Sequence, residues 1–181
     1  MSPLAIRNAT PDDAHDLHAI YAHYVLHGFG TFEEVPPGTS SFEDKIRTIA
    51  KHGLPFLVAQ SGGDIVGYAY ASPFRPRTGY RYSVEDSVYV RDDQRGRGVG
   101  LQLLKALIPR CEATGTRQII AVIGDSQNHG SIGIHARAGF EHAGTVRGAG
   151  YKLGRWVDIV MMQLALNGGT TTIPPAQGAW T

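Results

Sequence analysis

The spacing of apolar residues along the chain predicts alternating helices and strands. Apolar positions three and four residues apart indicate amphipathic helices, and Thr10 and the Ser40/Glu43 pair provide N-terminal caps for the first two. From Leu54 the apolar runs become short and β-branched, which is typical of strands. The elements expected in this half are a strand at 4–6, helices at 14–25 and 40–52, a loop at 27–39, and a β-hairpin with strands at 54–59 and 65–71.

The second half of the chain continues this alternation. The predicted elements are a polar, Arg-rich loop at 72–81, a central strand at 82–90, a helix at 99–114, a strand at 119–123, a helix at 128–140, and a final hairpin with strands at 143–147 and 157–166. From Asn167 the chain is rich in Gly, Thr and Pro and has little to bury. We therefore expect one α/β (α+β) domain over residues 1–166, with a mixed sheet and helices on both faces, followed by a flexible tail at 167–181.

Composition narrows the class of protein. A formal net charge of +1 over 181 residues gives no general affinity for nucleic acid or membrane surfaces. The single cysteine excludes an internal disulfide framework, and no Cys/His cluster has zinc spacing, so no metal is expected. The chain has no apolar stretch of membrane-spanning length, and its first residues lack the pattern of a signal peptide. These features predict a cytoplasmic protein.

A glycine-rich turn between the central strand and the next helix is the clearest chemical feature. Gly96, Gly98 and Gly100 stand at alternate positions, where missing Cβ atoms let a ligand approach the backbone. The helix that follows directs its free N–H groups and positive dipole end at this turn. The pattern predicts a site for a phosphate or pyrophosphate.

Two common phosphate motifs do not fit this turn. Leu101 occupies the place of the third glycine in a dinucleotide fingerprint, and Gly100 is not followed by the Lys and Ser/Thr of a P-loop. The pattern R-x-x-G-x-G does fit, with Arg95, Gly98 and Gly100 at its fixed places. This pattern resembles the acyl-CoA signature of the GCN5-related N-acetyltransferases (GNATs).

A second stretch resembles the same superfamily. Asn128, Ser131 and His135 precede Gly139-Phe140 on a predicted helix, and His135 stands where most members have tyrosine. Three further segments, residues 80–90, 133–135 and 152–158, are similar to phosphinothricin and methionine sulfone/sulfoximine N-acetyltransferases. The resemblance implies a mostly antiparallel GNAT-like sheet, acetyl-CoA as co-substrate, and a homodimer with the active site near its interface.

The resemblance also implies which residues bind acetyl-CoA. Successive amides of the glycine-rich turn would hold the pyrophosphate, the end of the central strand would splay and pair with the pantetheine arm, and the second stretch would hold the acyl region. The implied residues are Val88, Tyr89, Val90, Arg95, Gly96, Arg97, Gly98, Val99, Gly100, Leu101, Asn128 and Ser131.

Acetyl transfer to an amine needs a base, a polarised thioester carbonyl and a proton for the leaving thiolate. Glu85 occupies the position of the family's base and would accept a proton from the ammonium, directly or through a water. The Val90 amide would stabilise the oxyanion. His135 is a candidate acid for the thiolate or a hydrogen-bond donor to the sulfur, although a lone helical histidine can equally be structural.

Three arginines in the 72–81 loop suggest a carboxylate-bearing acceptor, because a guanidinium neutralises a carboxylate bidentately. Phosphinothricin-type compounds add a second polar head. Phe32 could line this site or simply plug the edge of the core. The substrate-binding residues predicted from the loop and the resemblance are Arg75, Pro76, Arg77, Arg81, Glu85, Asp86, Ser87 and Phe32.

The main functional prediction is therefore an acetyl-CoA-dependent N-acetyltransferase acting on a small glutamate- or methionine-like amino acid. Acetylation of a protein N-terminus or a polyamine is an alternative within the enzymes, although a polyamine site should be acidic rather than Arg-rich. A non-catalytic CoA-binding sensor is an alternative of another class, and the presence of Glu85 speaks against it.

Overall fold

In the computed structural model, which describes residues 3–180, seven strands form one sheet in the order β1-β2-β3-β4-β5-β7-β6. Neighbouring strands are antiparallel except β4 and β5, which are parallel. The mixed, mostly antiparallel sheet confirms the expected fold class. The strands are β1 (Leu4–Asn8), β2 (Phe56–Ser61), β3 (Asp64–Pro73), β4 (Ser83–Val90), β5 (Gln118–Gly124), β6 (Glu141–Lys152) and β7 (Arg155–Ala165).

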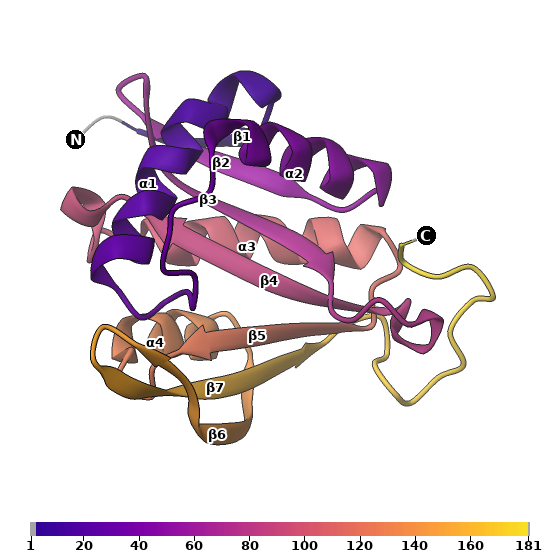
Figure 1. Ribbon diagram of the computed structural model, residues 1–181. Helices are drawn as coiled ribbons and strands as arrows, with labels where there is room; N and C mark the ends of the chain where they lie inside the picture. The colour runs from indigo at the N-terminus through magenta and orange to yellow at the C-terminus, as the bar shows by residue number, and fades with distance from the viewer. Residues whose placement is uncertain (1–2, 181) are drawn as a thin grey trace.

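The helices cover both faces of the sheet. The pair α1 and α2 packs on one face, against strands that include β2 and β3, while α3 and α4 lie together on the other (Figure 1). The helices are α1 (Ala14–His27), α2 (Thr39–Lys51), α3 (Val99–Ala113) and α4 (His129–Arg137), and the short 3-10 turns are η1 (Pro11–Asp13), η2 (Thr78–Tyr80) and η3 (Asp92–Gln94). The order of helices and strands agrees with the sequence-based prediction.

The two predicted N-terminal caps have different outcomes. Thr10 is the N-cap of η1, which leads directly into α1, and its backbone N–H donates to Asp13 Oδ2 at 2.7 Å. The N-cap of α1 itself is Asp13. The predicted box of Ser40 and Glu43 is wrong. The N-cap of α2 is Gly38, no side chain caps the helix, and Glu43 instead accepts a hydrogen bond from Arg47 at 3.0 Å.

The parallel strands β4 and β5 separate before they end. Their pairing runs only to Asp86 and Ala121, although β4 continues to Val90 and β5 to Gly124. The expected splaying of the central strand is therefore confirmed. It leaves backbone groups in the middle of the sheet that no neighbouring strand uses, and it opens a gap between the two faces.

The C-terminal segment at 167–180 differs from the expectation that it has little to bury. Ala179 is buried, and the Trp180 Nε1–H donates to the Ser83 carbonyl at 3.0 Å. Sequence reasoning missed these contacts because a Gly- and Pro-rich segment carries no periodic pattern. The flexibility of the segment and the domain boundary at residue 166 stay predictions.

Residues 3–180 were predicted to contain neither a membrane-spanning segment nor a metal site. No helix in this part of the chain is long and apolar enough to span a membrane. Within the same residues, no group of three or more His, Cys, Asp or Glu side chains is placed to hold a metal ion.

Candidate active site

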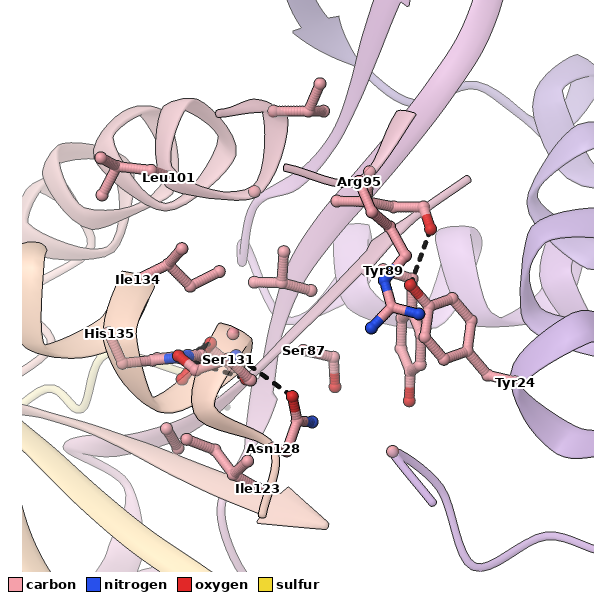
Figure 2. Close-up of a pocket in the computed structure, with 18 of the residues that line it drawn as sticks. Tyr24, Ser87, Tyr89, Arg95, Leu101, Ile123, Asn128, Ser131, Ile134 and His135 are labelled. Atoms are coloured by element: carbon pink, nitrogen blue, oxygen red, sulfur yellow. Dashed lines mark hydrogen bonds and ion pairs between the residues drawn. The ribbon is translucent and has the colours of Figure 1, made fainter. Parts of the chain in front are cut away.

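A cavity of about 290 Å³ occupies the gap between β4 and β5 (Figure 2). The end of β4 forms one wall, the end of β5 the other, and the N-terminal parts of α3 and α4 close one side. Of the residues implied to bind acetyl-CoA, those that line the cavity are Val88, Tyr89, Val90, Arg95, Gly96, Gly98, Val99, Gly100, Leu101, Asn128 and Ser131. The structure thus brings two segments that are distant in sequence to one cavity.

The direction of the β4 backbone determines which residues can pair with a ligand in the gap. The N–H of Arg91 donates to Val66 of β3, so alternate residues back along β4 also direct their backbone groups at β3. The backbone groups of Val88 and Val90, which alternate with those residues, face the gap. The Val90 carbonyl accepts the Tyr24 hydroxyl at 2.7 Å, which leaves the Val90 N–H directed at the cavity. Tyr89 contributes its side chain rather than its backbone.

The glycines of the glycine-rich turn differ in their surroundings. Gly96 and Gly98 adopt positive φ angles of 74° and 82°, which L side chains rarely adopt, and Gly98 is the N-cap of α3. No side chain caps this helix, so the first N–H groups of α3 face the cavity. Gly100 also lines the cavity, and a Cβ there would lie 2.9 Å from Ile134 Cδ1, the end of a side chain on α4. Contact of Gly100 with a ligand stays a prediction.

The second stretch forms the start of α4. Asn128 is its N-cap, and the Asn128 Oδ1 accepts the Ser131 N–H at 3.2 Å, as Figure 2 shows. The same side chain lines the cavity. Asn128 therefore has a structural task in addition to the predicted contact with acetyl-CoA, which stays a prediction.

His135 is buried at the base of the cavity with both ring nitrogens engaged. Its Nδ1 lies 2.7 Å from the Ser131 carbonyl oxygen, which can only accept, so Nδ1 carries a proton. Its Nε2 lies 3.0 Å from Asp86 Oδ2, and a proton must also lie between these two atoms. The other carboxylate oxygen, Asp86 Oδ1, is buried without a hydrogen-bond partner among residues 3–180.

The surroundings of His135 favour its charged form. Burial lowers the pKa of the ring, but the hydrogen bond and negative charge of Asp86, with the Ser131 carbonyl, outweigh burial and raise the pKa above its usual 6.5. No ring nitrogen is left for a direct bond to a sulfur. A proton for a leaving thiolate would have to come from the one shared with Asp86.

Asp86 was predicted to contact the acceptor. It lines the cavity and is paired with His135, and its contact with the acceptor stays a prediction. Successive side chains of a strand point to opposite faces, so Asp86 faces α4 whereas Glu85 and Ser87 face α1 and α2. The alternation of β4 already contained this information, because adjacent carboxylates on one strand cannot share one face.

Glu85 lies half-buried on the α1/α2 face of β4. Burial raises the pKa of its carboxyl, the positive charge of Arg75 lowers it, and the negative charge of Asp86 raises it, with a net rise above the usual 4.5. Further along the same face, the Tyr89 ring packs edge-on against Tyr21 with 5.1 Å between ring centroids. This face of β4 therefore carries packed aromatic rings and, on the same strand, a carboxylate that binds a proton more readily than an exposed carboxylate does.

The three loop arginines do not act alike. Arg75 is close enough to Glu85 to influence its pKa, and its guanidinium stacks on Phe74 at 4.5 Å. Arg77 is exposed, as is the neighbouring Pro76. Arg81 donates to the Thr78 carbonyl at 3.2 Å within the loop itself. Arg75 also donates within the loop, to the Phe74 carbonyl at 3.2 Å. Contact of the three arginines with the acceptor stays a prediction.

Seven predicted site residues do not line the cavity, namely Phe32, Arg75, Pro76, Arg77, Arg81, Glu85 and Arg97. Phe32 is 39% exposed and packs so closely on β6 that a Cβ at Gly150 would be 2.4 Å from its ring. Arg97 is exposed and donates to Gln94 at 3.3 Å. Sequence reasoning missed several lining residues, of which Tyr24 had been placed only within the predicted helix at 14–25. The missed lining residues include Tyr24, Ile123, Gly124, Gly130, Ile134 and Arg137.

The fold and this site define a class of protein, and comparison with known families confirms it. Residues 6–161 match the model of the acetyltransferase (GNAT) domain. The chain therefore belongs to the GNAT family of acetyltransferases. The resemblance in the glycine-rich turn and in the α4 stretch had indicated the same family.

Two individual relatives and one solved structure are similar to the chain over most of its length. The chain is 48% identical over 169 residues to the phosphinothricin N-acetyltransferase of Alcaligenes faecalis, covering 93% of this chain and 86% of that protein. It is 43% identical over 164 residues to the L-methionine sulfoximine/L-methionine sulfone acetyltransferase of Pseudomonas aeruginosa, covering 90% and 95% of the two chains. A crystal structure of a GNAT superfamily phosphinothricin acetyltransferase from Sinorhizobium meliloti in complex with AcCoA is similar, with a TM-score of 0.93, 42% identity, and coverage of 98% and 96%.

Proposed function

We propose that this protein is an acetyl-CoA-dependent N-acetyltransferase that acetylates the α-amine of a small amino acid of the phosphinothricin, methionine sulfone or methionine sulfoximine type. The observation that carries the proposal is the position of Glu85. This half-buried carboxylate has a raised pKa, a guanidinium beside it, and the gap between β4 and β5 next to it on the same strand. The names of the relatives supply the substrate class.

The cavity fits acetyl-CoA as a co-substrate. Its uncapped α3 N-terminus and the positive-φ glycines present N–H groups suited to a pyrophosphate. The unpaired backbone of Val88 and Val90 suits the amide-bearing pantetheine arm. Arg95 lines the cavity beside the Tyr24 ring (Figure 2), where it adds positive charge at the mouth.

In the proposed reaction, Glu85 takes a proton from the substrate ammonium, directly or through a water. The neutral amine then attacks the thioester carbonyl, and the carbonyl oxygen gains negative charge. The Val90 N–H, which faces the gap, stabilises that charge. A positioned general base contributes about 10²–10⁴-fold to the rate, and one oxyanion donor about 10²–10³-fold.

Collapse of the tetrahedral intermediate breaks the C–S bond, and the nitrogen loses its second proton to solvent, which gives the neutral amide. The thiolate then needs a proton. The Asp86–His135 pair holds one between Oδ2 and Nε2 at the base of the same cavity, and we propose that this pair supplies it. The Asp86–His135 pair then takes up a proton from solvent. Glu85 releases to solvent the proton that it accepted.

Arg75 and Arg77 would bind the carboxylate and the oxidised head group of the acceptor. The decisive experiment measures kcat/KM for L-phosphinothricin, L-methionine sulfone and L-methionine sulfoximine against their decarboxylated analogues, following thiol release from acetyl-CoA. Loss of a charge-assisted hydrogen bond corresponds to about ten- to over a hundred-fold. Equal values for an amino acid and its decarboxylated analogue would contradict an amino-acid acceptor.

We further propose that the enzyme is a cytoplasmic homodimer. The β6–β7 hairpin forms an edge of the sheet and exposes three large apolar side chains, with exposed fractions of 58% for Tyr151, 52% for Leu153 and 67% for Trp156. An exposed edge strand with such residues is suited to cover by a second copy. Sedimentation at micromolar concentration should give twice the chain mass, and Trp156→Glu should lower it. A monomeric wild type would contradict the proposal.

A further inference from the structure

The C-terminal segment at 167–180 folds back onto the protein. Arg117, which is buried, anchors its beginning, because the guanidinium bonds the Asn167 carbonyl, the Thr172 hydroxyl at 2.7 Å and the Ile173 carbonyl at 3.2 Å. A buried guanidinium with several acceptors on one segment holds that segment in place. The path of the chain beyond Ile173 is therefore directed toward the start of β4.

The end of this segment binds the loop that carries the arginines. The Ala179 N–H donates to the Arg81 carbonyl at 2.9 Å, and the Trp180 Nε1–H donates to the Ser83 carbonyl at 3.0 Å. The Tyr82 hydroxyl donates back to the Pro175 carbonyl. Three consecutive loop residues thus bond the segment, which lies beside the β3–β4 connection in Figure 1.

Packing accompanies these hydrogen bonds. A Cβ at Gly178 would lie 2.8 Å from the Arg81 Cβ, so glycine is required for the close approach of the two segments. The Trp180 ring lies edge-on to His52, with 5.9 Å between centroids. Ala179 is buried between these contacts. The segment thus packs on the rest of the protein through several consecutive residues.

Apart from the segment, little holds the loop. The other bonds to the rest of the protein lie at the two ends of the loop. The Phe74 N–H donates to the Ser83 carbonyl at 3.3 Å, and the Tyr82 carbonyl accepts the N–H groups of Arg117 and Gln118 at 2.8 and 3.2 Å. Among the described residues, the other hydrogen bonds of residues 75–81 stay within the loop. We propose that residues 175–180 position the acceptor loop, so that Arg75 and Arg77 are held beside Glu85. Trp180 is the main positioning residue. This inference rests on the proposed function of the loop.

The proposal predicts different effects on the KM values of the two substrates. The segment binds residues 81–83 at the start of β4, whereas the cavity for acetyl-CoA lies at the other end of the strand, at Val88–Val90. Loosening the segment should therefore raise KM for the amino acid by about ten-fold, as expected for loss of one charge-assisted contact. The KM for acetyl-CoA should stay unchanged.

The experiment compares Trp180→Ala and Trp180→Phe with the control Ile173→Ala, which changes a side chain in the same segment that is 94% exposed. The first readout is limited trypsin digestion with mass spectrometry of cleavage after Arg77 and Arg81, because the Arg75-Pro76 bond resists trypsin. The second is the pair of KM values. Thermal unfolding verifies that each variant is folded.

Faster cleavage with a higher amino-acid KM in both Trp180 variants, and neither change in Ile173→Ala, would support the inference. Unchanged cleavage in Trp180→Ala would overturn it, whatever the kinetics. Faster cleavage with both KM values unchanged would also overturn it. If the wild-type enzyme does not prefer amino acids over their decarboxylated analogues, the proposed function fails, and the cleavage rates alone then test whether the segment holds the loop.

Discussion

At the scale of single residues, the site depends on the opposite directions of two adjacent carboxylates. Glu85 faces α1 and α2 and Asp86 faces His135, because neighbouring side chains on a strand point to opposite faces. Each carboxylate also meets a different cation. Arg75 acts on Glu85, and the imidazolium of His135 acts on Asp86. One strand can thereby present a base on one face and a proton donor on the other.

The acid limb of the pH–rate profile should report Glu85. Glu85→Gln should lower kcat/KM by about 10²–10⁴-fold and remove that limb. Since the charge of Arg75 lowers the pKa of Glu85, Arg75→Gln should raise that pKa and shift the limb to higher pH. The measurement is kcat/KM for L-methionine sulfone across the pH range.

Arg77→Gln is the matched control for this shift. Arg77 lies in the same loop but is not among the charges that influence the pKa of Glu85. Its loss should raise the amino-acid KM and leave the limb in place. Identical shifts in both arginine variants would show that the limb reports binding of the acceptor and not Glu85.

The Asp86–His135 pair should make stability depend on pH. The pKa of His135 is raised in the folded chain, so its contribution is complete below the unfolded pKa of about 6.5 and is lost as pH rises through the folded value. Asp86→Asn removes the carboxylate that raises this pKa. Denaturation should show a loss on the order of 1–3 kcal/mol near pH 6 that becomes smaller toward pH 9.

An exposed pair of the same kind provides the comparison. Asp92 lies 3.6 Å from His23 with both side chains about half exposed. Asp92→Asn should therefore change the free energy of unfolding by less than about 1 kcal/mol at any pH. A pH-independent loss in Asp86→Asn would mean that the buried pair does not bind an extra proton.

At the scale of elements, α3 and α4 pack against each other and both line the cavity. Gly→Ala inside a helix usually stabilises by about 0.5–1 kcal/mol. Gly100→Ala should stabilise less than this, because its Cβ would meet Ile134 Cδ1 at 2.9 Å and that side chain must shift. Ile134→Val removes that methyl group, so the double variant should be more stable than the sum of the two single effects by about 0.5–3 kcal/mol.

Gly133→Ala on α4 is the control for this cycle, because nothing lies within 4 Å of a Cβ at that position. It should show the ordinary stabilisation of an alanine in a helix. The measurement is urea denaturation of the five chains. Strict additivity of Gly100→Ala and Ile134→Val would contradict the expected contact between the new Cβ and Ile134.

At the scale of the whole molecule, one lysine links β6 to the end of α1 and to the loop that follows α1. Lys152 on β6 is 1% exposed, and its ammonium donates to the Thr31 carbonyl at 2.8 Å and to the Tyr24 carbonyl at 3.2 Å. Lys152→Met should destabilise by about 1–3 kcal/mol and speed amide exchange in the loop between α1 and α2. Lys105→Met, at an exposed position of α3, should do neither. Unchanged exchange in the loop would remove Lys152 as its anchor.

Much of this architecture could be predicted from the sequence because it depends on local chemistry. Apolar spacing specifies helix and strand positions, and Thr10 and Gly98 mark helix starts through their own backbone preferences. The resemblance in the glycine-rich turn and in the α4 stretch then indicated the family that the comparison confirmed. Ser40 and Glu43 show the limit of such local rules, since α2 begins one residue before Ser40 and its backbone needs no side-chain cap.

Only the tertiary structure decided which distant residues meet. The Asp86–His135 pair joins β4 to α4, Gly100 lies against Ile134, and Trp180 bonds the Ser83 carbonyl from the far end of the chain. Such contacts depend on how strands twist and helices pack, so no periodicity of one segment encodes them. The sequence by itself determined the elements and the turn suited to a phosphate, and it placed Glu85 on the central strand. The structure determined how these parts are held.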